Sequence, residues 1–141
     1  MRKSMLLSAA LFLLLPLAAA CGDDSTNEAD LIGVGWSCTV DTDCPVQVCD
    51  DDATPCPQLS CLTQFTGGYC GLADCTNHEG CPVGSACVAH DDGTNYCFRT
   101  CVDKPECNTH RGTEEEANCA ASVTWVPDRE GKACVPPSSG I

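Results

Sequence analysis

Aromatic side chains are scarce in this chain, and basic side chains are far fewer than acidic ones. Only 5% of the 141 residues are aromatic, and 7 Lys and Arg stand against 20 Asp and Glu, giving a formal net charge of −13. So few large apolar rings build only a thin core, and covalent cross-links must then supply stability. The acidic balance argues against nucleic acid as a partner, because phosphate binding requires clustered Lys and Arg.

Sequence motifs of enzymes and metal sites are also missing. No two cysteines have the Cys-x-x-Cys spacing of redox and zinc sites, and the closest pair is Cys97 and Cys101. The histidines His78, His90 and His110 show no metal-binding spacing, and we expect them in exposed loops. No serine lies in a nucleophile elbow, and no glycine loop has a phosphate-binding pattern. We therefore predict that the chain is not an enzyme and has no cofactor.

Cysteine is what the chain has in excess. It accounts for 15 of 141 residues, above the roughly 8–10% that marks a disulfide scaffold. Disulfides form and persist in oxidising compartments outside the cytoplasm. We therefore predict a small disulfide-rich fold, mostly loops and short β-hairpins, organised as three tandem cysteine-rich units with little helix.

The N-terminal residues have the three parts of an export signal. Arg2 and Lys3 give a positive start, residues 5–15 are almost wholly apolar, and residues 16–20 are small apart from Leu17 and Pro16. The apolar run is shorter than the roughly 20 residues needed to span a bilayer. A cleaved signal is therefore preferred to a transmembrane helix.

The sequence Ala18-Ala19-Ala20-Cys21 resembles the lipobox of bacterial lipoproteins. The resemblance implies that residues 1–20 are the signal peptide, that the Cys21 sulfur carries a lipid, and that this anchor holds the protein on the membrane. It also implies a place in the bacterial cell envelope, periplasmic or surface-exposed, and Gly22 favours the outer membrane over the inner one. The alternative is an ordinary secretory signal cut near Ala20, which leaves Cys21 as a thiol.

The number of cysteines supports lipidation of Cys21. The count of 15 is odd, and an odd cysteine in an exported protein requires an explanation. Assigning Cys21 to lipid leaves 14 cysteines, enough for seven bridges.

Small, polar and acidic residues follow Cys21, and such residues cannot bury apolar surface. We therefore expect residues 21–35 to form a lipidated, flexible acidic tether.

Cysteine spacing indicates an internal repeat. Three pairs of cysteines each enclose five residues, and each pair opens a unit. The units cover residues 36–73, with an inserted loop at 49–61, residues 74–99, and residues 100–136. A tail follows at residues 137–141, and we expect the chain to be frayed from Pro136 onward. The predicted disulfide cysteines are Cys38, Cys44, Cys49, Cys56, Cys61, Cys70, Cys75, Cys81, Cys87, Cys97, Cys101, Cys107, Cys119 and Cys134.

Within each unit we expect the first cysteine to bond the third and the second to bond the fourth, with Cys49 and Cys56 as extra cysteines in the first unit. This order predicts the bonds Cys75–Cys87, Cys81–Cys97, Cys101–Cys119 and Cys107–Cys134.

Turn residues predict three hairpins. The strongest joins the strand-like residues before and after Asp91-Asp92-Gly93-Thr94, because glycine accepts positive φ. A second is expected between residues 122–126 and 133–135, and a third around Thr66-Gly67-Gly68. Residues 113–121 have an acidic start and several alanines, which predicts one short helix.

Loop aspartates could offer oxygen ligands to calcium. The best candidates are Asp50, Asp51 and Asp52, in a loop that Cys49 and Cys56 could close. Neither these residues nor the other loop aspartates fit the twelve-residue EF-hand pattern. The prediction is therefore that there is no metal site, with these three as weak calcium candidates.

The function that these features favour is a lipid-anchored, non-enzymatic binding or structural module with a protein or glycan partner. The alternative is a protease inhibitor, with the Cys49–Cys56 loop as its exposed element, or a small secreted enzyme. Trp36, Tyr69, Tyr96 and Trp125 could anchor an interface. In a fold with so little core they could equally form the core itself, and we prefer that interpretation.

Overall fold

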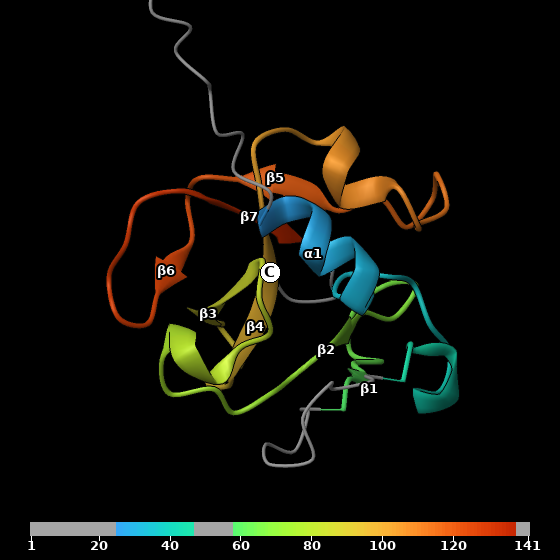
Figure 1. The fold of residues 1–141 in the computed structure, drawn as a ribbon, viewed down its shortest axis with the longest axis horizontal. Helices are drawn as coiled ribbons and strands as arrows, with labels where there is room; N and C mark the ends of the chain where they lie inside the picture. The colour runs from blue at the N-terminus through green and yellow to red at the C-terminus, as the bar shows by residue number, and fades with distance from the viewer. Residues whose placement is uncertain (1–24, 47–57, 138–141) are drawn as a thin grey trace, which may run out of the picture.

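The computed structural model describes residues 25–46 and 58–137 (Figure 1). They form a small disulfide-rich fold with one eight-residue helix, α1 (Ser25–Ile32), while the remaining elements are short strands, 3-10 turns and loops. The predicted fold class is confirmed. The 3-10 turns are η1 (Asp41–Asp43), η2 (His78–Gly80) and η3 (Pro105–Asn108).

Within the described residues, seven strands form two antiparallel sheets. A two-stranded ribbon joins β1 (Ser60–Cys61) to β2 (Cys70–Gly71). The larger sheet has the order β5-β7-β4-β3-β6. Its strands are β3 (Ser85–Ala89), β4 (Asn95–Cys101), β5 (Asn118–Ala120), β6 (Thr124–Trp125) and β7 (Lys132–Val135).

Two of the three predicted hairpins are confirmed. Strands β3 and β4 pair across the Asp-Gly turn, with Cys87 opposite Cys97 and Gly93 at φ +87°. Strands β1 and β2 pair across the Gly67-Gly68 turn. Gly68 is required there, because its φ is +64° and a Cβ would lie 2.1 Å from the carbonyl oxygen of Cys38.

The predicted hairpin between residues 122–126 and 133–135 is wrong. Strand β6 pairs with β3, so that Trp125 lies opposite Val88, while β7 lies between β5 and β4. Trp125 is 7% exposed and Ala133 is fully buried. Burial of these two side chains at different places in the sheet outweighs the local turn between them.

The predicted helix over residues 113–121 is also wrong. Asn118–Ala120 is strand β5, and no helix covers the described residues 113–121. The side chain of Asn108 accepts from the Ala117 N–H at 2.7 Å and donates to its carbonyl at 3.0 Å. This amide takes both backbone groups of Ala117, so they are not available to a helix.

The expected flexible tether over residues 21–35 requires correction. Helix α1 occupies Ser25–Ile32, and Ala29 and Val34 are fully buried. Gly33 ends the helix at φ +85°, and the Val34 N–H bonds back to the Ala29 carbonyl at 3.0 Å, as in a Schellman cap. The polar residues at the start of this segment suggested a tether, whereas apolar residues of its second half pack into the core.

The four candidate aromatics belong to the core. Tyr69 is fully buried, Tyr96 is 4% exposed, and Trp125 packs in the same cluster, with Trp36 half-buried against it. Phe65 makes edge-to-face contacts with Tyr69, Tyr96 and Phe98 at ring-centre distances of 5.2–6.1 Å. The preferred interpretation of these side chains as core is confirmed.

The end of the chain is more ordered than a frayed tail. Pro136 is fully buried, and the Pro137 carbonyl accepts from the Thr66 N–H at 2.7 Å. Residues 138–141 lie outside the described part of the chain.

Candidate functional site

Disulfide bonds determine where each loop of this fold is held. The described cysteines form six bonds: Cys38–Cys61, Cys44–Cys70, Cys75–Cys87, Cys81–Cys97, Cys101–Cys119 and Cys107–Cys134. These are the first-to-third and second-to-fourth bonds that the spacing predicted. Cys21, Cys49 and Cys56 lie outside the described residues.

The three units share one local construction. In each, a 3-10 turn lies immediately before or around the second cysteine, and the N–H of that cysteine donates one of the hydrogen bonds of the turn. These bonds run from Cys44 to Asp41, from Cys81 to His78 and from Cys107 to Lys104, at 3.1 Å each. The third and fourth cysteines then face each other across two antiparallel strands.

Acidic side chains close the first loop in two of the units. Asp43 accepts from the N–H of Thr39 at 2.8 Å and of Val40 at 3.1 Å. Glu106, in the same position of the third unit, accepts from the Val102 N–H at 2.7 Å. The two bonds to Asp43 hold the pKa of its carboxyl below the usual value. The acidic residue before the second cysteine is therefore explained by loop structure.

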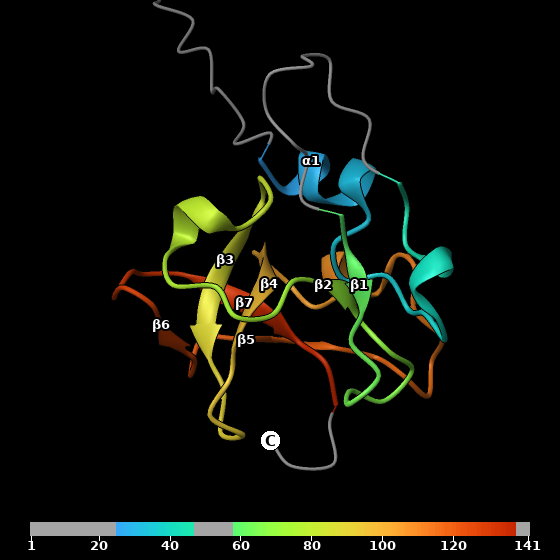
Figure 2. The same cartoon turned by 90° about the horizontal axis from the view of Figure 1, so that it is seen from below.

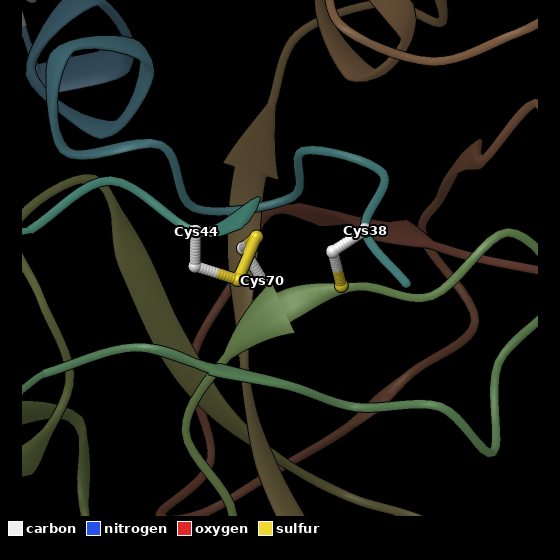
Figure 3. Close-up of side chains that lie close together, drawn as sticks. All are labelled: Cys38, Cys44 and Cys70. Atoms are coloured by element: carbon white, nitrogen blue, oxygen red, sulfur yellow. A yellow bond between two sulfur atoms is a disulfide. The ribbon is translucent and has the colours of Figure 1, made fainter. Parts of the chain in front are cut away.

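Three groups of cysteine sulfurs lie within 4.8 Å of one another, one group in each unit. Figure 3 shows the first, in which the Cys44–Cys70 bond lies beside the sulfur of Cys38. Cys38 is itself bonded to Cys61. A cysteine binds a metal ion as a thiolate. Because each of these sulfurs is held in a disulfide, they act as cross-links and not as a metal centre.

Two further loop aspartates, Asp41 and Asp92, have structural partners of their own. Asp41 accepts from the Cys61 N–H at 2.8 Å. Asp92 accepts from the Thr94 N–H at 2.8 Å and from the Tyr96 hydroxyl at 2.7 Å, which lowers the pKa of its carboxyl. The calcium candidates Asp50, Asp51 and Asp52 lie outside the described residues.

The expectation of three exposed loop histidines holds only for His110, which is exposed and stacks on Trp36 at 4.0 Å between ring centres. His78 is half-buried, with one ring nitrogen accepting from the Cys87 N–H and the other 2.7 Å from the Pro127 carbonyl. The side chain of His90 is only 6% exposed. Both rings fill space that a core with few aromatics leaves open.

A hollow of about 210 Å³ lies beside the end of the β3–β4 hairpin. Val88, Phe98 and Val123 line its apolar part, and His90 and Ser122 contribute polar groups. With Asp92 next to the His90 ring, the residue types of an acyl-transfer triad are close in space. Among the described residues, however, Nε2 of His90 has no hydrogen-bond partner, so Ser122 does not bond to this ring in the structure.

Arg111 is the residue that sequence reasoning missed. Its guanidinium donates to the carbonyls of Gly35 at 3.2 Å, Gly68 at 2.9 Å and Thr66 at 2.8 Å, and to that of Glu115 at 2.7 Å. Burial lowers the pKa of Arg111. One side chain of the third unit thus holds the first unit in place, and no local pattern marks it.

Within residues 25–46 and 58–137, no helix has both the length and the apolar character needed to cross a bilayer. Comparisons with protein families, with curated proteins and with solved structures each find no match.

Proposed function

We propose that this protein is a lipoprotein of the bacterial envelope, anchored through Cys21, and that its folded part is a non-enzymatic binding or structural module. The observation that supports this most is the use of cysteine. Every cysteine of the described residues is in a disulfide, and the six bonds leave only Cys21, Cys49 and Cys56 to be assigned. A pair in the inserted loop then leaves Cys21 without a partner.

The same chemistry supports an extracytoplasmic location. Six disulfides in so small a fold require an oxidising compartment to form and persist. The leader with its basic start and short apolar run supplies the route there. Gly22, after the lipidated cysteine, favours the outer membrane.

A protein or glycan is the partner we favour. The acidic balance of 20 carboxylates against 7 basic residues disfavours phosphate backbones. Disulfides fix the loops before binding, so that little conformational entropy is lost when a partner docks. The hollow beside His90 lacks a hydrogen-bonded nucleophile and base, which supports binding over turnover.

The experiment compares the full chain with its Cys21→Ser variant in a bacterium with an outer membrane. The wild type should sediment with membranes and require detergent for release. The variant should appear in the soluble envelope fraction, or as an uncleaved precursor. The double variant Cys107→Ala/Cys134→Ala removes two cysteines but not the anchor, so it should stay with the membranes. A wild type found in the soluble fraction would contradict the proposal.

A further inference from the structure

Helix α1 begins close to the proposed anchor. Four residue steps separate Cys21 from Ser25, where α1 starts. An extended chain covers at most about 3.6 Å per residue, so α1 begins within about 14 Å of the lipidated residue. The folded part must therefore lie near the membrane surface.

Helix α1 is also fixed to the body of the protein. Ala29 is fully buried, and Asp30 forms an ion pair with Arg99 of β4, a side chain that is 4% exposed. A helix held in this way cannot act as a hinge, so the orientation of α1 determines that of the whole domain.

The end of the domain at α1 carries the two most exposed large apolar side chains of the described residues. Leu31 is 78% exposed, and Val46 is 77% exposed. Leu31 is on α1 itself. Val46 lies in the loop beside the end of this helix, since a ring carbon of its neighbour Pro45 is 2.4 Å from the position that a Cβ on Gly33 would take. Apolar side chains at the end of a domain that is held close to a bilayer can enter its interfacial region.

The β3–β4 turn lies at the opposite end. Arg99, which contacts α1, pairs with Ser85 at the start of β3. From Ser85 the strand continues for five residue steps to His90, about 17 Å at 3.3 Å per residue. Figure 2 shows α1 at one end of the molecule and the turn between β3 and β4 at the other.

We infer that the α1 end of the domain lies on the bilayer, with Leu31 and Val46 in the headgroup region, and that the β3–β4 turn faces away toward the partner. This inference rests on the proposed lipid anchor. The fitting surface is one of zwitterionic lipid, since the carboxylates of Asp23, Asp24 and Glu28, close to Cys21 in the sequence, would be repelled by anionic headgroups.

The test uses the acylated full-length protein, reconstituted in vesicles of phosphatidylethanolamine and phosphatidylcholine, with the acyl group confirmed by mass. An apolar fluorescent amino acid replaces Leu31 in one sample and Asp91, in the distal turn, in another. Quenching by headgroup spin-labelled lipid should be roughly threefold stronger at position 31, because interfacial apolar groups lie about 5–10 Å into the headgroup boundary. Val46→Ser should weaken the quenching at position 31. Val40→Ser, at an exposed valine of the η1 loop, should leave it unchanged.

Equal quenching at positions 31 and 91 in a protein of confirmed acylation would overturn the orientation and leave the anchor intact. So would an equal effect of the two valine substitutions. A protein that carries no acyl group would overturn both the orientation and the proposed function.

Discussion

Cys87 and Cys97 face each other across the β3–β4 hairpin, yet each bonds to a cysteine of the preceding loop. Cys87 bonds Cys75 and Cys97 bonds Cys81, so two bridges attach the η2 turn to two neighbouring strands. The same relationship holds in the first and third units. A hairpin already has backbone hydrogen bonds, whereas the loop has few, so bridges to the loop stabilise the part that needs them.

Removing one bridge should destabilise the fold without leaving a free thiol. The pair Cys107→Ala/Cys134→Ala opens a loop of 27 residues, and Cys81→Ala/Cys97→Ala opens one of 16. Chain-entropy arguments give about 3 kcal/mol for each loop. Urea unfolding under non-reducing conditions measures the loss. A loss below about 1 kcal/mol for both pairs would contradict the role given to the bridges.

Substitution of Arg111 should separate the first unit from the third. Arg111→Ala leaves the carbonyls of Gly35 and Gly68 without their donor, and we expect a loss of about 3 kcal/mol in the free energy of unfolding. Arg111→Lys should recover little, because one ammonium cannot reach carbonyls that a planar guanidinium bridges. Arg129→Ala, which removes an exposed contact over Trp125, is the control and should cost about 0.5–1 kcal/mol. Equal losses for Arg111→Ala and Arg129→Ala would show that Arg111 has no special role.

Tyr69→Phe should lower stability in a pH-dependent way. The Tyr69 hydroxyl accepts from the buried Arg99 N–H at 2.9 Å, and the loss of this acceptor should cost about 1–3 kcal/mol. Burial raises the pKa of Tyr69 from 10.0 to about 12. The contribution of Tyr69 is therefore complete below pH 10 and is lost as the pH rises toward 12.

The measurement for Tyr69 is the urea midpoint of both proteins from pH 8 to 12, with non-reducing electrophoresis to verify the disulfides. The difference between wild type and Tyr69→Phe should narrow above pH 10. A constant difference over the whole range would mean that the pKa of Tyr69 is the same in the folded and the unfolded protein, so that burial does not raise it.

Asp43→Asn should alter stability at acidic pH. The pKa of Asp43 is lowered by the Thr39 and Val40 N–H groups, so its contribution is present above the ordinary pKa of 3.8 and is lost as the pH falls through the lowered value. The variant should be less stable than the wild type near neutral pH, and the difference should shrink in acid. Asp128→Asn, in an exposed loop, should behave as the wild type. If Asp43→Asn instead keeps the same deficit at every pH, the bonds to the carboxylate are not its source.

The expected disulfide order and the expected β3–β4 hairpin are confirmed, and both involve residues that lie close in sequence. Cysteines separated by fixed gaps and an Asp-Gly turn are local signals. Strand β7 could not be placed in this way, since Ala133 pairs with the end of β4, a strand that begins in the second unit.

The same limit applies to the docked helix and to Arg111. Helix α1 depends on burial of Ala29 and on the ion pair with Arg99, which is 69 residues away. Arg111 contacts carbonyls up to 76 residues away. No local pattern reports contacts of such range, and the acidic start of the α1 segment instead suggested a tether.

The most direct test of the account is the intact mass of the protein purified from native membranes, before and after reduction. We predict a chain that begins at Cys21, carries its lipid on that residue, and gains about 14 hydrogens on reduction, one for each remaining cysteine. A chain without lipid at Cys21, or one that gains far fewer hydrogens because its thiols are free, would contradict the account.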